Sequence, residues 1–381
     1  MANPYAQAGV DVGIEAQASV IMYEACRATF QNRAGKIGEV RTLTDSFSGS
    51  KFVPIGGLPL GSCMFMGFDG AGTMVEVAQR VQDHSTIGWH LMAMLADDAP
   101  VRGGEAALMG SVLDLKSLGM DERHLPKVRE LADGLVAAAS AAGVSVINGE
   151  IAQMGARVSG YGDFPFIWGG ACVWFAREDR LFTGMEIQVG DAVVMFAEPS
   201  VRTNGISLMH KVFSQYHGDE WHNQAFGKST LGVELMQAPV IYSRLATHLR
   251  GGFSGEPAAK IHGFCHITGG GIPEKMRRLL RPSGLGAKLT RLCAPPPIVL
   301  HCQELTQLTR TEGTKPISDF DCYGTWGMGN GYAAITPEPG KVIAEAALFG
   351  VDAKNAGPIT QQPGIIIVSQ GLERFGEELT Y

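Results

Sequence analysis

The feature that most constrains the fold is a run of three glycines, Gly269 to Gly271, between two segments of different pattern. Residues 263–267 before it are mostly apolar, which predicts a short buried strand. Residues 272–280 after it carry Pro273 in the first turn and arginines near the end, which predicts a helix. A glycine run that opens a helix can present backbone N–H groups to an anion, or it can form a tight turn. The stretch alone leaves both interpretations open.

The length and charge of the chain limit what kind of protein it can be. Its 381 residues suffice for two domains, and strand-like and helix-like segments alternate, which predicts a mixed α/β fold. We place the domain boundary in the polar, turn-rich stretch 178–191, so that residues 1–180 form an N-terminal domain and residues 181–381 a C-terminal one. The net charge is −7 and no basic block occurs, which argues against a nucleic-acid partner.

Cysteine usage and hydropathy indicate a cytoplasmic protein. The chain has seven cysteines, none in a Cys-x-x-Cys pair, which is typical of buried free thiols in a reducing compartment. No apolar run reaches the roughly 18 residues that a membrane span needs. Residues 1–5 lack the basic and apolar regions of a signal peptide. We therefore expect a cytoplasmic enzyme without a membrane partner.

The clearest secondary-structure signal is an amphipathic helix over residues 122–142. Its apolar side chains recur at three- and four-residue steps, and Gly143 ends it. The polar stretch 45–51 predicts a surface loop. Further helices are expected at 14–30, 83–95, 206–216, 240–249, 272–280 and 337–349. Strands are expected at 62–68, 144–147, 166–177, 192–197, 263–267 and 364–368.

Eight sequence motifs occur in a fixed order along the chain. They are YAQAGVD (5–11), FDGAGT (68–73), HSTIGWHLMAMLADD (84–98), INGEIAQM (147–154), GDAVVMFAEPSVRTNGISLMHKVF (190–213), APVIYSRL (238–245), HITGGG (266–271) and WGMGNGY (326–332). This ordered set resembles the aminoimidazole ribonucleotide synthetase (phosphoribosylformylglycinamidine cyclo-ligase) family. The wider superfamily also contains formylglycinamide ribonucleotide amidotransferase, selenophosphate synthetase, thiamine phosphate kinase and a hydrogenase maturation factor.

The resemblance implies a fold and a reaction. The N-terminal domain would be α/β, with strands that form a barrel across a homodimer, and the C-terminal domain would be an α/β sandwich. A cleft between the domains would hold ATP and Mg²⁺. The enzyme would phosphorylate the formyl-amide oxygen of a ribonucleotide substrate, and an amidine nitrogen would then attack the same carbon and expel phosphate. Such a reaction depends on positioning and charge neutralisation rather than on a nucleophilic side chain.

Three acidic residues match the metal-binding positions that the resemblance implies. Asp69 follows the expected strand 62–68 and would act in catalysis and bind Mg²⁺, with Asp98 and Glu150 as further ligands. Carboxylates that converge from strand ends are the ligands that Mg²⁺ prefers. Asp69 could instead cap a turn, and Asp98 could be a solvated acid at a helix end.

The resemblance also implies a phosphate site built from backbone N–H groups and small polar side chains. His266 would be the second catalytic residue, although a lone histidine in an apolar strand is more often structural. The residues expected to bind ATP or phosphate are Gly70, Gly72, Thr73, Arg202, Thr203, Asn204, Thr268, Gly269, Gly270 and Gly271.

Several family positions carry different residues in this chain. The lysine of the family's DGVGTK is Met74, which cannot neutralise phosphate charge. The first glycine of GGETAEM is Asn148, the asparagine of VND is Asp97, and the histidine of SSGxHSNG is Arg202. The Gly-rich loop that covers ATP in the family has its nearest counterpart in residues 45–51. Arg202 could restore the positive charge lost at Met74.

Three functions therefore remain open from the sequence. The first is the ATP- and Mg²⁺-dependent cyclo-ligase of purine biosynthesis or a divergent relative. The second is another ATP-dependent enzyme of the superfamily that phosphorylates a different carbonyl or acid oxygen. The third is a paralogue that binds nucleotide without catalysis.

Overall fold

The computed structural model describes residues 11–43, 49–308 and 315–381. The expected motif at 5–11 and the first part of the expected loop at 45–51 lie largely outside the described residues. The chain divides into two compact units. The N-terminal unit comprises residues 1–99 and 104–179, and the C-terminal unit comprises residues 100–103 and 180–381.

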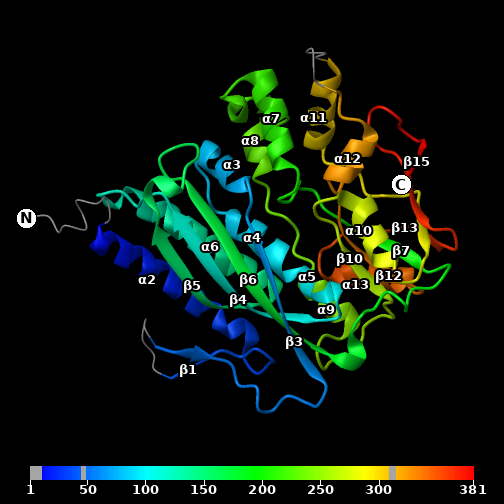
Figure 1. Ribbon diagram of the computed structural model, residues 1–381, viewed down its shortest axis with the longest axis horizontal. Helices are drawn as coiled ribbons and strands as arrows, with labels where there is room; N and C mark the ends of the chain where they lie inside the picture. Colours follow the sequence, from blue (N-terminus) through cyan, green and yellow to red (C-terminus); the bar gives the residue numbers. More distant parts are fainter. Residues whose placement is uncertain (1–10, 44–48, 309–314) are drawn as a thin grey trace, which may run out of the picture. The chain divides into compact units, whose positions relative to one another are not determined.

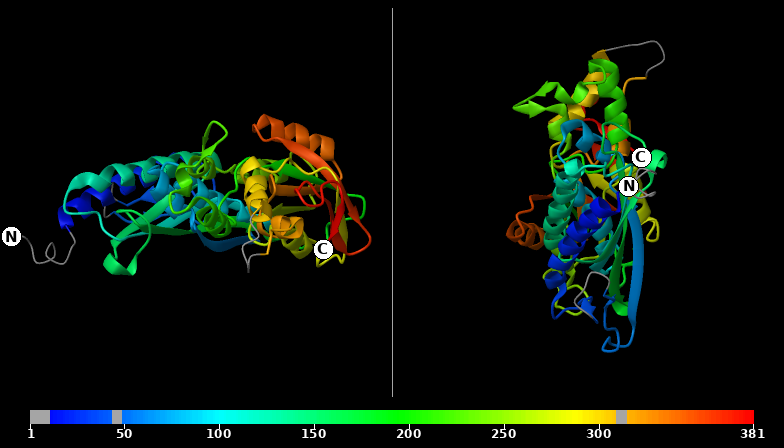
Figure 2. Two further views of the ribbon diagram at one scale, coloured as in Figure 1. Left: turned by 90° about the horizontal axis from the view of Figure 1, so that it is seen from above. Right: turned by 90° about the vertical axis from the view of Figure 1, so that its left-hand side faces the viewer.

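The N-terminal unit is built on a sheet with the strand order β3-β6-β4-β5 (Figure 1). Its strands are β3 (Ser62–Gly70), β6 (Phe166–Arg177), β4 (Glu105–Leu115) and β5 (Ser145–Gln153). β6 runs antiparallel to both β3 and β4, whereas β4 and β5 are parallel. The helices α2 (Val12–Ala28), α4 (Ile87–Ala96) and α6 (Leu125–Ala142) lie on one side of this sheet, as Figure 2 shows.

Local sequence explains how the helices begin and how closely they pack. Asp11 caps α2, because its side chain accepts hydrogen bonds from the N–H groups of Gly13 and Ile14 at 2.8 and 3.1 Å. The α4–α6 contact depends on Gly134, since a Cβ there would lie 2.0 Å from the carbonyl oxygen of Ser85. α6 ends at Gly143, whose φ of 71° is left-handed.

The side of the sheet opposite the helices is apolar and exposed, and we call it the open face. Met64, Met66 and Phe68 alternate along β3 and are 62%, 52% and 75% exposed. Val112 of β4 and Ile167 of β6 are also about half exposed. Because side chains alternate along a strand, these residues share one side of the sheet.

The C-terminal unit is built on a longer sheet with the order β10-β12-β7-β13-β11-β14-β15. Its strands are β7 (Ala192–Ala197), β10 (Gly263–His266), β11 (Gly286–Leu289), β12 (Asn330–Thr336), β13 (Ala353–Thr360), β14 (Gly364–Val368) and β15 (Glu378–Thr380). Neighbouring strands are antiparallel except for β11 and β14. His266 pairs with Tyr332, and Asn330 pairs with Ala197, so the ends of β7 and β10 meet the start of β12 at one edge.

Helices and an aromatic core complete the C-terminal unit. The helices are α7 (Ile206–His217), α8 (Leu231–Leu235), α9 (Ser243–Arg250), α10 (Gly271–Leu280), α11 (Pro297–Leu308), α12 (Asp319–Thr325) and α13 (Pro339–Leu348). The rings of Phe196, Tyr242 and Tyr332 stack in the core, with Tyr242 and Tyr332 centred 5.5 Å apart. Val101 packs against the same core, although it lies in sequence between the two segments of the N-terminal unit.

Smaller elements connect the main ones. They are β1 (Arg41–Thr42), β2 (Lys51–Phe52), α3 (Met74–Val81), α5 (Asp98–Val101), β8 (Ala225–Phe226) and β9 (Ser229–Thr230). Among the described residues, no helix combines the length and the apolar character that crossing a membrane requires. All seven cysteines are unpaired, as expected from the sequence.

The expected mixed α/β fold is confirmed, with two corrections that concern site residues. Asp69 lies inside β3, one residue before its end, and does not follow the strand. Glu150 lies in the middle of β5 and not after it. β5 continues past the expected end at 147 because its pairing with β4 continues as far as Gln153, a partner that the local pattern does not reveal.

Candidate functional site

The turn between β3 and α3 presents Asp69 to solvent. The Gly70 N–H donates to Asp69 Oδ1 at 2.7 Å, and the Ala71 N–H donates to the carbonyl oxygen of Trp168 at 2.9 Å. Gly72 has a φ of +56°, which favours glycine at this tight position. Thr73 then begins α3. The turn therefore brings a carboxylate and a glycine-rich backbone to one place, as the sequence predicts.

Met74 occupies the core and has no exposed surface. The side chain at the family's lysine position therefore packs inside the N-terminal unit. It does not reach solvent next to Asp69. Any cation that neutralises phosphate must come from elsewhere in this protein.

Asp69 and Asp98 lie near the same part of β6. Asp69 pairs with Gly170 and points to the helix-covered side, because its neighbour Phe68 faces the other way. Burial raises the pKa of Cys172 to about 12, and the nearby charge of Asp98 adds to that rise. Asp97, in contrast, is fully buried at the end of α4, while Asp98 is exposed. Asp69 thus lies opposite Gly170, and Asp98 lies close enough to influence Cys172 in the same strand.

Within one chain, Glu150 lies apart from Asp69 and Asp98. It is exposed on β5, across three strand spacings from β3, or about 14 Å. Alternation also turns its side chain away from that of Asp69, toward the open face with Val112. Glu150 borders a concavity of about 650 Å³ over the open face. Among the described residues, no group of three or more His, Cys, Asp or Glu side chains could hold a metal ion by itself.

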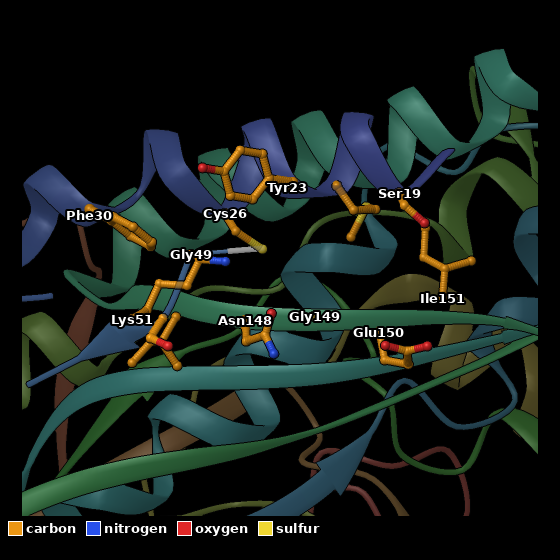
Figure 3. Close-up of a pocket in the computed structure, with 13 residues that line it drawn as sticks. Ser19, Tyr23, Cys26, Phe30, Gly49, Lys51, Asn148, Gly149, Glu150 and Ile151 are labelled. Carbon is orange, nitrogen blue, oxygen red and sulfur yellow. The ribbon is translucent and has the colours of Figure 1, made fainter. Parts of the chain in front are cut away.

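A cavity of about 460 Å³ lies between α2 and β5, and we call it the α2–β5 cavity (Figure 3). It is lined by Ser19, Met22, Tyr23, Cys26, Phe30, Gly49, Ser50, Lys51, Ile147, Asn148, Gly149, Glu150 and Ile151. Lys51 Nζ lies 4.9 Å from the centre of the Tyr23 ring. Burial raises the pKa of Cys26 to about 11, and the charge of Lys51 opposes that rise. The cavity thus combines aromatic walls with a cation.

The sequence did not single out Tyr23 or Lys51. Lys51 is the last residue of the polar stretch 45–51, which is the nearest counterpart of the family's Gly-rich loop, and this position was the one available signal. Tyr23 lies in an ordinary helical pattern. Only the packing of α2 against β5 shows that the two residues border a cavity.

The glycine run adopts the conformation that its sequence indicates. Gly270 and Gly271 have φ values of +88° and +61°, and α10 begins at Gly271. A Cβ on Gly271 would lie 1.8 Å from the carbonyl oxygen of Tyr323, so no side chain fits there. The Gly271 N–H donates to the carbonyl oxygen of Thr268 at 2.8 Å. The side chain of Glu274 lies over Gly270, at the positive end of the helix.

The turn after β7 lies beside this glycine run in the C-terminal unit. Asn204 Oδ1 is 4.0 Å from the point where a Cβ on Gly269 would stand. Gly205, with a φ of +70°, begins α7 next to the Trp326 ring. Asn204 therefore lies beside Gly269, which is the exposed residue of the glycine run.

Arg202 and His266 are in direct contact in the same unit. Arg202 Nη2 lies 2.9 Å from His266 Nε2, and Arg202 Nη1 donates to Glu198 Oε2 at 3.0 Å. Arg202 and Glu198 are both 3% exposed. Burial raises the pKa of Glu198, while the charge of Arg202 and hydrogen bonds from Ser200 oppose the rise. The guanidinium of Arg202 is therefore engaged inside the protein, which disfavours it as a replacement for the charge lost at Met74.

Sequence comparison relates both units to one family. Residues 56–173 match the AIR synthase related protein, N-terminal domain, and residues 188–369 match the AIR synthase related protein, C-terminal domain. The phosphoribosylformylglycinamidine cyclo-ligase of Geobacillus kaustophilus (strain HTA426) is 31% identical over 94% of this chain and 97% of its own. The protein of the same name from Pyrococcus furiosus is 28% identical, over 97% of this chain and 98% of its own.

Solved structures share the fold at low sequence identity. Thiamine-monophosphate kinase from Stenotrophomonas maltophilia K279a aligns with a TM-score of 0.60 and 13% identity, over 93% of this chain and 97% of that one. The hydrogenase maturation protein HypE in complex with ATP aligns with a TM-score of 0.50 and 13% identity, over 89% and 87%.

Proposed function

The chain belongs to the AIR synthase family, and we propose that it is the ATP-dependent cyclo-ligase of purine biosynthesis that converts formylglycinamidine ribonucleotide to aminoimidazole ribonucleotide. The observation that carries the proposal is the 31% identity to a relative of that name over 94% of this chain. The site geometry supports it through the carboxylates near β6 and the glycine run that opens α10.

The proposed reaction has two chemical steps. The γ-phosphoryl group of ATP is transferred to the formyl-amide oxygen, which makes that oxygen a good leaving group. An amidine nitrogen of the same substrate then attacks the activated carbon, the ring closes, and phosphate leaves. The protein contributes by holding the reacting groups in line and by stabilising charge on the phosphoryl oxygens.

We assign nucleotide-binding groups within each unit separately. The α2–β5 cavity has the aromatic walls and the polar rim that suit a nucleotide, with Lys51 as a local cation. The exposed backbone of Gly269 and the side chains of Thr203 and Asn204 suit phosphate oxygens.

The carboxylates near β6 suit Mg²⁺ bound together with phosphate. Asp69 and Asp98 supply two hard oxygen donors, and the described residues contain no cluster that would bind a metal alone. Mg²⁺ commonly takes one or two carboxylates and completes its shell with water and substrate phosphates. When bound there, the ion would neutralise the negative charge of the transferred phosphoryl group.

The open face supports a homodimer. Met64, Met66 and Phe68 are apolar and exposed on one long strand, which is the pattern of a surface that a second copy covers. A sheet-to-sheet contact there would produce the barrel that the family resemblance implies, and it would bury the concavity that Glu150 borders. The unpaired cysteines further suit a reducing compartment such as the cytoplasm.

The test is direct turnover. Purified protein incubated with ATP, Mg²⁺ and formylglycinamidine ribonucleotide should release ADP and aminoimidazole ribonucleotide in equal amounts. Expression of the gene should also restore growth of a purine auxotroph that lacks this ligase. Absence of both products, together with failure to restore growth, would reject the proposal.

One observation favours a second candidate. Met74 is buried and Arg202 is paired with Glu198, so the site differs from the family pattern at two charged positions. An enzyme of this fold with a different acceptor for the phosphoryl group would account for both changes. A screen of ATP consumption against small carbonyl and carboxylic acid metabolites distinguishes the two candidates.

A further inference from the structure

Glu198 and Arg202 form a buried ion pair that spans a single turn. Their charged atoms lie 3.0 Å apart, and both side chains are 3% exposed. In the family pattern SSGxHSNG, serine and histidine stand at these two positions. A buried charge without a partner is strongly unfavourable, so either substitution alone would destabilise the turn. The glutamate in place of serine and the arginine in place of histidine therefore depend on each other.

The ion pair is held by a dense set of hydrogen bonds. The Ser200 hydroxyl donates to Glu198 Oε1 at 2.8 Å and accepts from the Arg202 N–H at 3.0 Å. The Val240 N–H donates to Glu198 Oε2 at 3.2 Å. Arg202 Nη1 also donates to the carbonyl oxygen of Val240 at 2.8 Å. The backbone of Arg202 has a φ of +52°, a conformation that a non-glycine residue keeps only when its surroundings enforce it.

The same guanidinium contacts the histidine before the glycine run. Arg202 Nη2 is 2.9 Å from His266 Nε2. An arginine side chain has donors and no acceptor, so Nε2 accepts this bond and the ring proton resides on Nδ1. The Tyr332 ring, centred 5.7 Å from that of His266, packs on the imidazole and limits its rotation. His266 ends β10, three residues before the first glycine of the run.

We infer that Arg202 is a positioning residue, anchored by Glu198, that holds His266 in a single orientation with Nε2 as acceptor and the proton on Nδ1. Arg202 acts through His266 and does not bind phosphate itself. The kinetic part of this inference rests on the proposed function, in which His266 borders the phosphate site. The structural part stands on the contacts within the C-terminal unit.

The main test compares the state of the His266 ring with and without the guanidinium. R202M alone would leave Glu198 buried without a partner, so the primary variant is the neutral pair E198Q/R202M. Protein labelled with ¹⁵N-histidine is measured by NMR, and the signals of His266 are identified by their loss in H266Q. The wild type should show one tautomer protonated at Nδ1, and E198Q/R202M should show a mixture. An unchanged His266 spectrum in the double variant would overturn the inference.

Two further variants separate charge from geometry. R202K retains a positive charge next to Glu198 but lacks the planar fork that reaches two partners. It should keep the wild-type melting temperature within a few degrees and lose the single-tautomer spectrum; a wild-type spectrum would contradict the positioning role. The control is R250M, because Arg250 packs on Phe182 and donates to the carbonyl oxygen of Arg180 in the same unit. It should leave the His266 spectrum unchanged.

Kinetics supply an independent readout. E198Q/R202M should lower kcat by roughly 10- to 100-fold, with a much smaller change in KM for ATP, because a misoriented group costs rate more than binding. A change in KM for ATP alone would assign Arg202 to phosphate binding and reject the inference. If the wild type forms no aminoimidazole product, the proposed function fails, whereas the His266 spectrum still decides whether Arg202 positions the ring.

Discussion

Lys51 Nζ lies 4.9 Å from the centre of the Tyr23 ring, where β2 and α2 border the same cavity. The contact keeps the ammonium group beside the cavity that β5 also borders. Among the residues that line the α2–β5 cavity, Lys51 carries the cationic side chain, and it would contact the nucleotide that we propose there.

Replacement of Lys51 by methionine should weaken ATP binding by about 3- to 30-fold, since one charge-assisted contact at a partly exposed site is lost. Isothermal titration calorimetry with ATP and Mg²⁺ measures the change, and K51R should bind nearly as wild type. The matched control is K36M, which removes an exposed lysine of the same unit. Equal affinity of K51M and wild type would place the nucleotide elsewhere.

Asp69→Asn should reduce kcat by about 10²-fold or more, which is the scale of losing one electrostatic partner of the transition state. Asp98→Asn should act in the same direction, because both carboxylates lie near residues 170–172 of β6. Both variants should also raise the Mg²⁺ concentration that gives half-maximal rate. Asp133→Asn, on an exposed position of α6, serves as the control. If D69N had the rate and the Mg²⁺ dependence of the wild type, Asp69 would not be a metal ligand.

Phe68→Glu should dissociate the proposed homodimer. The side chain is 75% exposed on the open face, and a carboxylate there would be buried against the second copy without a partner. Light scattering coupled to size-exclusion chromatography should show a dimer for wild type and a monomer for F68E. Leu348→Glu, at a 78% exposed position of α13, should remain dimeric. A monomeric wild type would refute the assignment of the open face.

Asp319→Asn should destabilise the C-terminal unit by about 2 kcal/mol at pH 7, since the amide places an NH₂ donor against other donors. The fully buried carboxylate accepts from Gln303 Nε2, the Ser369 hydroxyl and the N–H groups of Glu373 and Arg374. Burial alone would raise the pKa of Asp319, but these hydrogen bonds outweigh it and hold the pKa below its usual value.

The pH dependence of this effect follows from the lowered pKa. A carboxyl group whose pKa is lower in the folded state stabilises the fold above its unfolded pKa of about 3.9 and loses that contribution as the pH falls through the folded value. The difference in melting temperature between wild type and D319N should therefore be constant from pH 7 to about pH 5 and shrink below about pH 4. Asp352→Asn, at an exposed position, should show no such difference. If the difference in melting temperature between wild type and D319N grew as the pH fell, the lowered pKa of Asp319 would be contradicted.

The local sequence predicted those helices and strands whose buried side can be read from their own residues. α6 has apolar side chains on one face and a left-handed glycine at its end, and β6 and β7 are apolar runs bounded by turns. β4 and β12 were not predicted. Both contain paired alanines, which favour helices, and they become strands because each lies between two partners in the middle of a sheet. Such pairing joins segments far apart in the chain.

The site shows the same division. The conformation of Gly270 and Gly271 follows from their sequence, since a side chain at Gly271 would collide with the backbone at Tyr323. The different burial of Asp97 and Asp98 does not follow from their sequence. Two adjacent acidic residues look alike until α4 packs, which buries Asp97 and leaves Asp98 exposed. The pairing of Arg202 with Glu198 likewise appears only once the turn is folded.

The short excursion of the chain at Pro100–Gly103 has a consequence for handling the protein. These four residues belong to the C-terminal unit, and Val101 packs against its core. A protease that cleaves only between Asp179 and Arg180 would leave two fragments that co-purify. The first fragment carries residues 100–103, which pack in the C-terminal unit. An N-terminal half expressed alone would lack the core against which Val101 packs. The two halves should therefore be co-expressed.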